Sequence, residues 1–88
     1  MATDKESERT YKAVANRRRI AILRHLHSGG ATVGELARAI RLSVKATSKH
    51  MQILAASGFV QSEQQGLYVH YSLGAHSETQ RILKNLFH

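Results

Sequence analysis

The fold is decided by residues 32–60, which read TVGELARAIRLSVKATSKHMQILAASGFV. Thr32 and Glu35 have the spacing of a capping box, in which each side chain satisfies a free backbone N–H of the other residue. Leu36, Ala37 and Ile40 follow at helical spacing, and Arg41-Leu42-Ser43 supplies a break and a new cap. The stretch therefore predicts a short helix, a tight turn and a second helix from Val44 to Ala56, which Gly58 ends.

The second of these helices is predicted to have two unlike faces. One face is a continuous polar stripe, because its residues are spaced i, i+3, i+4 and i+7; it consists of Lys45, Ser48, Lys49 and Gln52. The other face is expected to pack on the core and consists of Val44, Thr47, Met51 and Leu54. Lysine can bond guanine or phosphate, glutamine can pair with adenine, and serine can do either. The polar stripe therefore fits a helix that reads DNA in the major groove.

Helices precede this pair and a hairpin follows it. We expect a first helix over about residues 5–15 and a second, capped by Asn16, that ends near His27 before Gly29 and Gly30. Beyond Gly58 we expect strands over 59–63 and 67–73, a turn at 64–66, and a last helix over about 77–87. The order α-α-α-α-β-β-α is mainly α with a β-hairpin and predicts a winged helix-turn-helix, with residues 1–88 as one DNA-binding domain.

The positive charge of the chain is concentrated in one stretch. Residues 11–50 hold nine lysines and arginines against Glu35 alone, whereas the whole chain carries a net charge of +7. Such a block favours a polyanion as partner, since basic residues that neutralise phosphates release counterions. There is no cysteine and no run of eighteen apolar residues, so we expect a cytoplasmic protein without disulfides, thiolate metal sites or a membrane span.

Several segments together resemble the ArsR family of bacterial and archaeal regulators. They are Tyr11–Leu23, Thr32–Ala37, Thr47-Ser-Lys-His-Met-Gln-Ile-Leu54, Ser57-Gly-Phe-Val60 and Tyr68–Leu73. The resemblance implies a homodimer built from the first and last helices, which binds a near-palindromic operator of double-stranded DNA and usually represses. It also implies that Ser43 to Ala56 is the recognition helix.

These expectations assign two sets of site residues. The DNA-binding set is the polar stripe, the turn before it and the wing: Arg41, Ser43, Lys45, Ser48, Lys49, Gln52, Gln64 and Gln65. The dimer-interface set joins the first helix to the apolar side of the last: Tyr11, Val14, Ile82, Leu83, Leu86 and Phe87.

The metal sites of the family are not retained. Where many members place a Cys-x-Cys pair, this chain has Thr32 and Gly34, and the positions of a second ligand set on the last helix read Ala75, Ser77 and His88. One imidazole is not a site, so we expect no metal and no cofactor, and the effector is unknown. His50 is expected to pack and form hydrogen bonds, while His25 and His27 point in different directions on their helix.

Two alternatives to a simple DNA-binding regulator stay open. The wing has Leu67 rather than arginine after Gly66, which allows a winged helix that serves as a protein-interaction module. A metal could also join His76 or His88 to a partner subunit, which would make the protein a metal-responsive repressor. No paired carboxylates or nucleophile context indicate an active site, so we do not expect an enzyme.

Overall fold

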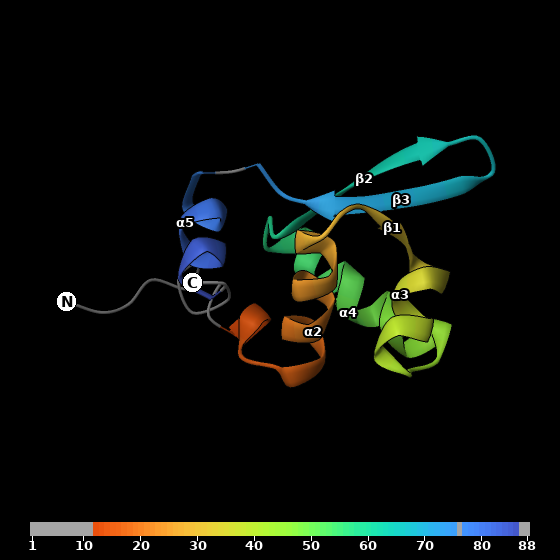
Figure 1. The fold of residues 1–88 in the computed structure, drawn as a ribbon, viewed down its shortest axis with the longest axis horizontal. Helices are drawn as coiled ribbons and strands as arrows, with labels where there is room; N and C mark the ends of the chain where they lie inside the picture. Colours follow the sequence, from red (N-terminus) through yellow and green to blue (C-terminus); the bar gives the residue numbers. More distant parts are fainter. Residues whose placement is uncertain (1–11, 76, 87–88) are drawn as a thin grey trace.

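The computed structural model describes residues 12–75 and 77–86 and is mainly helical with a small antiparallel sheet (Figure 1). Its elements, in chain order, are α2 (Arg17–His27), β1 (Ala31–Thr32), α3 (Val33–Ile40), α4 (Val44–Ala56), β2 (Val60–Gln65), β3 (Tyr68–Leu73) and α5 (Ser77–Leu86). Residues 12–14 are also helical, and most of the first helix expected over residues 5–15 lies outside the described residues. The expected winged helix-turn-helix is confirmed.

Polar side chains begin three of the helices, as predicted. Asn16 Oδ1 accepts hydrogen bonds from the backbone N–H groups of Arg18 (2.9 Å) and Arg19 (3.1 Å) at the start of α2. The capping box of α3 is complete: Thr32 N–H donates to Glu35 Oε1, and Glu35 N–H donates to Thr32 Oγ1. The hydrogen bond from the Thr32 backbone N–H, together with the Thr32 side chain, lowers the pKa of the Glu35 carboxyl. Each cap satisfies donors that a helix start leaves unpaired.

Arg41 ends α3 and makes the turn into α4. Its φ of 56° places it in the left-handed region, and it is the one non-glycine residue with positive φ in the described part of the chain. The N–H of Leu42 then donates to the carbonyl of Ala37 (3.0 Å), which closes the end of the helix. Three residues, 41–43, thus connect α3 to α4. Ser43 Oγ caps α4 by accepting a hydrogen bond from the N–H of Ala46.

The sheet has the order β1-β3-β2 and is antiparallel throughout. The hairpin is longer than predicted, because β2 and β3 pair from Val60↔Leu73 to Gln65↔Tyr68, and the turn is Gly66-Leu67 rather than residues 64–66. Gly66, with φ 64°, takes the first central position of this two-residue turn, where a positive φ is required. The predicted order also lacked β1, whose two residues pair with β3 at Ala31↔Tyr71.

The core lies between the helices and the base of the hairpin. Its largest fully buried side chains are Phe59, Ile22, Leu23, Leu36, Met51, Leu54 and Thr47. Val44 was expected to face this core but is 52% exposed, because it lies in the first turn of α4, next to the exposed turn residues. The rest of the apolar face of α4 is buried as predicted.

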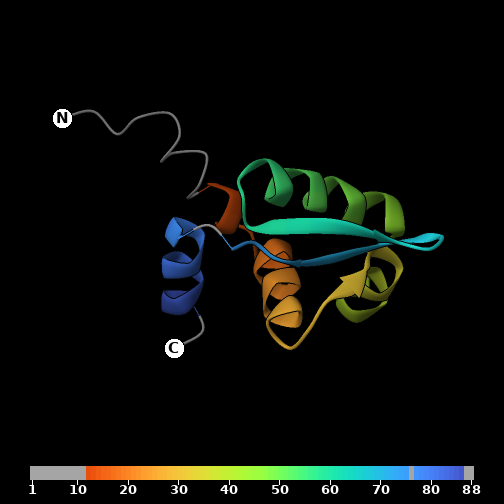
Figure 2. The same ribbon diagram turned by 90° about the horizontal axis from the view of Figure 1, so that it is seen from above.

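The molecule is elongated, with the hairpin turn at one end and α5 at the other (Figures 1 and 2). Helices α2, α3 and α4 lie between these two ends, so the end of α5 and the tip of the wing are far apart. No helix in the described part of the chain has the length and apolar character needed to cross a membrane.

Gly74 lets the end of β3 approach the end of α4. A Cβ atom built on Gly74 would collide with the backbone carbonyl oxygen of Gly58, while the N–H of Gly74 donates to the carbonyl of Phe59 (2.8 Å). The Gly58 carbonyl and Gly74 both belong to the backbone, so the two segments cannot move apart without breaking the hydrogen bond between Gly74 and Phe59.

We therefore expect Gly74→Ala to lower the free energy of unfolding by about 2 kcal/mol or more, as in overpacked cores. Gly34→Ala is the matched control, because a Cβ there meets nothing closer than Thr32 Oγ1 at 3.9 Å. Since Gly34 lies inside α3, alanine should leave the stability unchanged or raise it by up to about 1 kcal/mol. Urea unfolding of both variants measures this, and equal stabilities would contradict the collision.

Candidate nucleic-acid interface

Helix α4 is held to the core by one face. Thr47, Met51 and Leu54 have exposed fractions of 0%, 1% and 0%. Thr47 buries its hydroxyl without cost to hydrogen bonding, because Oγ1 donates to the carbonyl of Ser43 (2.8 Å). These three residues fix how far the helix can rotate, and so fix which side chains it presents outward.

The opposite face presents the predicted polar stripe to solvent. Lys45, Lys49 and Gln52 are exposed and Ser48 is half-buried. Arg41 and Ser43, in the turn before α4, are exposed as well, and the Ser43 hydroxyl also forms the helix cap. Since α3 packs against α4 across this turn, the two helices have the arrangement of a helix-turn-helix with the stripe on its outer helix.

The wing has a polar strand and an apolar tip. Gln64 and Gln65 are exposed at the end of β2, and Gln64 Nε2 donates to the carbonyl of Gly66 (2.9 Å), which steadies the turn. Beyond it Leu67 is 93% exposed and Tyr68 is 65% exposed. The sequence analysis noted Leu67 after Gly66 but did not place it at the tip, because it put the turn at residues 64–66, although the pair Gly66-Leu67 is readable as a two-residue turn.

Arg19 joins three elements, and the sequence prediction did not include it either. Its guanidinium donates to the backbone carbonyls of Ala13 and Lys12, at the end of the first helix, and Nη1 lies 3.2 Å from Nδ1 of His50 on α4. An arginine has donors only, so Nδ1 must be the acceptor and His50 must be neutral there. The first helix and α4 are thus connected through one side chain of α2.

The surroundings of His50 oppose its protonation. Burial lowers the pKa of its imidazole, and the guanidinium groups of Arg19 and Arg18 lower that pKa further. The expectation that His50 packs and forms hydrogen bonds is therefore confirmed, with Arg19 as its partner.

The residues predicted for a dimer interface lie at different depths. Val14 and Leu83 are 8% and 3% exposed and belong to the core of the chain itself, and Ile82 is partly buried against that core. Tyr11, Phe87 and the side chain of Leu86 lie outside what the structure describes. The described part of this set thus offers Ile82 as its most accessible apolar side chain.

The positions that correspond to family metal ligands have other roles where they are described. Thr32 is the cap of α3 and Gly34 has no side chain to offer. In the described part of the chain no three or more His, Cys, Asp or Glu residues lie together as a metal site would need. His76 and His88 lie outside the described residues.

A model of the helix-turn-helix domain family matches residues 14–63, which is more than half of the chain. Among curated proteins, the transcriptional activator HlyU of Vibrio cholerae is 38% identical over 64 residues. That sequence match covers 73% of this chain and 59% of the relative, so the matched part spans less than two thirds of the length of the curated relative.

Solved structures show the same fold over nearly the whole chain. HlyU from Vibrio cholerae aligns with a TM-score of 0.83 at 31% identity, covering 96% of this chain and 94% of that one. A second structure is the homodimeric winged helix-turn-helix DNA-binding domain of a Mycobacterium bovis protein, described as a possible ArsR-family transcriptional regulator. It aligns with a TM-score of 0.83 at 28% identity, and the alignment covers 92% of this chain and 74% of that one.

The burial of His50 and its contact with Arg19 predict a pH dependence of stability. The pKa of His50 is lowered from its ordinary value of 6.5 in the folded state, so the unfolded chain takes up this proton first as the pH falls. Neutral His50 therefore contributes fully to the free energy of unfolding above about pH 6.5. This contribution is lost progressively as the pH falls below that value, and the loss stops below the lowered pKa of the folded state.

His50→Asn should remove this part of the pH dependence, because the amide oxygen can accept from Arg19 where Nδ1 does and does not titrate. Urea midpoints measured between about pH 7.5 and pH 5 should fall more for the unmodified protein than for the variant. Parallel curves for the two proteins would show that protonation of His50 does not disturb the fold.

Proposed function

The chain belongs to the helix-turn-helix domain family as a winged-helix regulator of the ArsR type, and on that premise we propose that it binds specific operator DNA as a homodimer. Its recognition helix is α4, which enters the major groove with the polar stripe toward the bases. Binding represses transcription by occupying the promoter.

The observation that carries the proposal is the two-faced structure of α4. Three residues with at most 1% exposure hold one face to the core, while Lys45, Lys49 and Gln52 are exposed on the other. A helix whose only task was to cover the core would not need this capped turn before it or a wing beside it. Lys49 and Gln52 suit guanine and adenine edges, and Lys45, near the start of the helix, suits a backbone phosphate.

The dimer is proposed from α5 and the first helix. The Mycobacterium bovis relative is described as homodimeric, and α5 lies at the end of this chain away from the wing (Figure 2). A two-fold axis at that end would place two copies of α4 about one helical turn of DNA apart, roughly 34 Å. Ile82 is the described apolar side chain most available to such an interface.

Selection of bound sequences from a random duplex pool tests the central proposal. We expect a two-fold symmetric site with half-sites about ten base pairs apart. When this site is placed in a reporter promoter, expression of the protein should lower transcription; higher transcription would match the activator role named for the Vibrio cholerae relative.

Lys49→Ala and Gln52→Ala should each weaken binding to the selected site by about 1–3 kcal/mol, because the helix then no longer reads one base. Each should also relax the sequence preference. Lys84→Ala is the matched control, since it removes the same charge from an exposed position on α5. Fluorescence anisotropy with the selected and a scrambled duplex measures both. If Lys84→Ala and Lys49→Ala weaken binding equally, α4 is not the reading element.

Ile82→Glu should dissociate the proposed dimer, because it places a carboxylate in an apolar interface. Sedimentation equilibrium should then give the monomer mass, and affinity for the two-fold site should fall with it. Asn85→Glu adds the same charge at an exposed position of the same helix and should leave the dimer intact. A dimer that survives Ile82→Glu with its affinity unchanged would place the interface elsewhere.

The wing tip supports a second candidate, a protein-interaction module. Leu67 and Tyr68 are exposed side by side in sequence at the tip, where a cation would be needed to meet a phosphate. This candidate takes precedence if the selection enriches no sequence and binding to duplex DNA depends on salt alone.

A further inference from the structure

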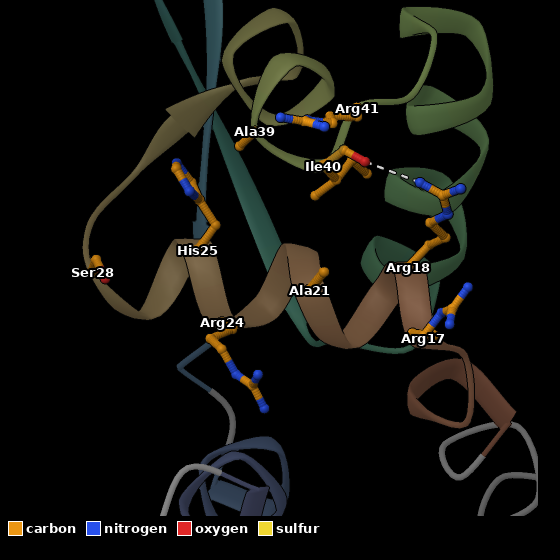
Figure 3. A pocket seen from close by; sticks show the side chains of 9 residues that line it. All are labelled: Arg17, Arg18, Ala21, Arg24, His25, Ser28, Ala39, Ile40 and Arg41. Carbon is orange, nitrogen blue, oxygen red and sulfur yellow. Dashed lines mark hydrogen bonds between the residues drawn. The ribbon is translucent and has the colours of Figure 1, made fainter.

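An open hollow of about 720 Å³ lies between α2 and the end of α3. Its walls include a group of polar and basic side chains, with Ala21, Ala39 and Ile40 at its base: Arg17, Arg18, Arg24, His25, Ser28 and Arg41. Figure 3 shows Arg18 and His25 pointing from α2 toward α3, Arg41 along the end of α3, Arg17 at the start of α2, and Arg24 pointing away from α3. A volume of this size is typical of sites for small molecules.

The charge around the hollow is of one sign. Four arginines line it and none of the residues that line it is acidic. Cations gathered around one cavity repel each other, and the repulsion is relieved when an anion enters. Guanidinium groups bind phosphate and carboxylate oxygens with paired, charge-assisted hydrogen bonds, which makes arginine the residue most suited to oxyanions.

The two sides of the hollow are held in place before any ligand binds. Arg18 Nη1 donates to the carbonyl of Ile40 (2.9 Å), so a guanidinium of α2 is fixed against the last turn of α3 and uses one of its five N–H groups there. Arg41 has its backbone in the left-handed conformation at the turn, and its side chain is exposed. A non-glycine residue in that conformation costs free energy, and such residues are enriched at functional sites.

We propose that this hollow binds a phosphate group, with Arg18 and Arg41 as its main ligands and His25 and Ser28 as further hydrogen-bonding groups. The phosphate belongs either to the DNA backbone beside the operator or to a small phosphorylated molecule. Because Arg41 precedes the recognition helix by only the two residues Leu42 and Ser43, a ligand held here stabilises the turn that positions α4. Binding of the small molecule does not require the proposed DNA-binding function, whereas the DNA source rests on it.

The first experiment titrates inorganic phosphate into the isotopically labelled full chain at constant ionic strength, followed by nuclear magnetic resonance. Shifts should be confined to α2 and residues 39–41. Arg41→Gly and Arg18→Ala should each weaken phosphate binding about tenfold, the equivalent of one charge-assisted hydrogen bond. Glycine accepts the left-handed conformation and alanine favours a helix, so both variants should fold, which thermal unfolding checks.

Arg38→Ala is the control, because Arg38 is an exposed arginine of α3 that does not line the hollow. It removes the same charge and should leave phosphate affinity within about twofold of its original value, as expected for a screened surface charge. An equal loss in all three variants would mean that phosphate responds to net charge only.

The second experiment identifies the source through the salt dependence of duplex binding. If a backbone phosphate occupies the hollow, Arg18→Ala should lower the slope of log affinity against log salt by about one, with Lys84→Ala unchanged. An unchanged slope together with localised phosphate shifts assigns the hollow to a small phosphorylated molecule. The proposal is overturned if Arg18→Ala and Arg41→Gly bind phosphate as Arg38→Ala does and Arg18→Ala leaves the salt slope unchanged. If the protein binds no DNA, the phosphate titration alone decides.

Discussion

The burial of Thr47, Met51 and Leu54 is the constraint on which the rest of the structure depends. These three side chains lock the rotation of α4, and the polar stripe faces outward only because they face inward. The same face carries the chain onward, since the N–H of Phe59 donates to the carbonyl of Leu54 and Phe59 is itself fully buried. The hairpin therefore starts from a fixed point of the core, so that the wing and α4 keep a defined position relative to each other.

A second constraint acts through Arg19, which ties α4 to the end of the first helix. Hydrogen bonds from a guanidinium to backbone carbonyls are stronger than neutral ones, and this side chain makes two of them besides its contact with His50. A movement of the first helix would have to break these bonds or carry α4 with it. If the first helix takes part in a dimer, the spacing between subunits and the orientation of α4 are mechanically linked through α2.

Features that depend on neighbouring residues in the sequence were predicted, whereas features that depend on contacts between distant residues were not. The caps at Asn16, Thr32 and Ser43 depend on residues at most four apart, which is why helix bounds could be read from the sequence. The two-residue strand β1 exists only because β3 lies beside it, and no periodicity can be seen in two residues. The same distinction separates the two parts of the candidate site. The polar stripe of α4 follows from helical spacing alone, and three of its four residues are exposed, whereas the contact of Arg19 with His50 spans 31 residues and depends on how α2 crosses α4.

The positions of the basic side chains change the interpretation of the charge between residues 11 and 50. Its nine lysines and arginines suggest one electrostatic footprint, yet Arg18 and Arg19 hold backbone carbonyls of neighbouring elements. Lys45 and Lys49 extend from α4, while Arg17, Arg24 and Arg41 gather with Arg18 around the hollow. Salt dependence reports the phosphates that are actually contacted, so the charge of the stretch sets only an upper limit. The positive charge of this chain therefore holds helices together at Arg18 and Arg19, and at the exposed positions it is available for the anionic partner proposed above.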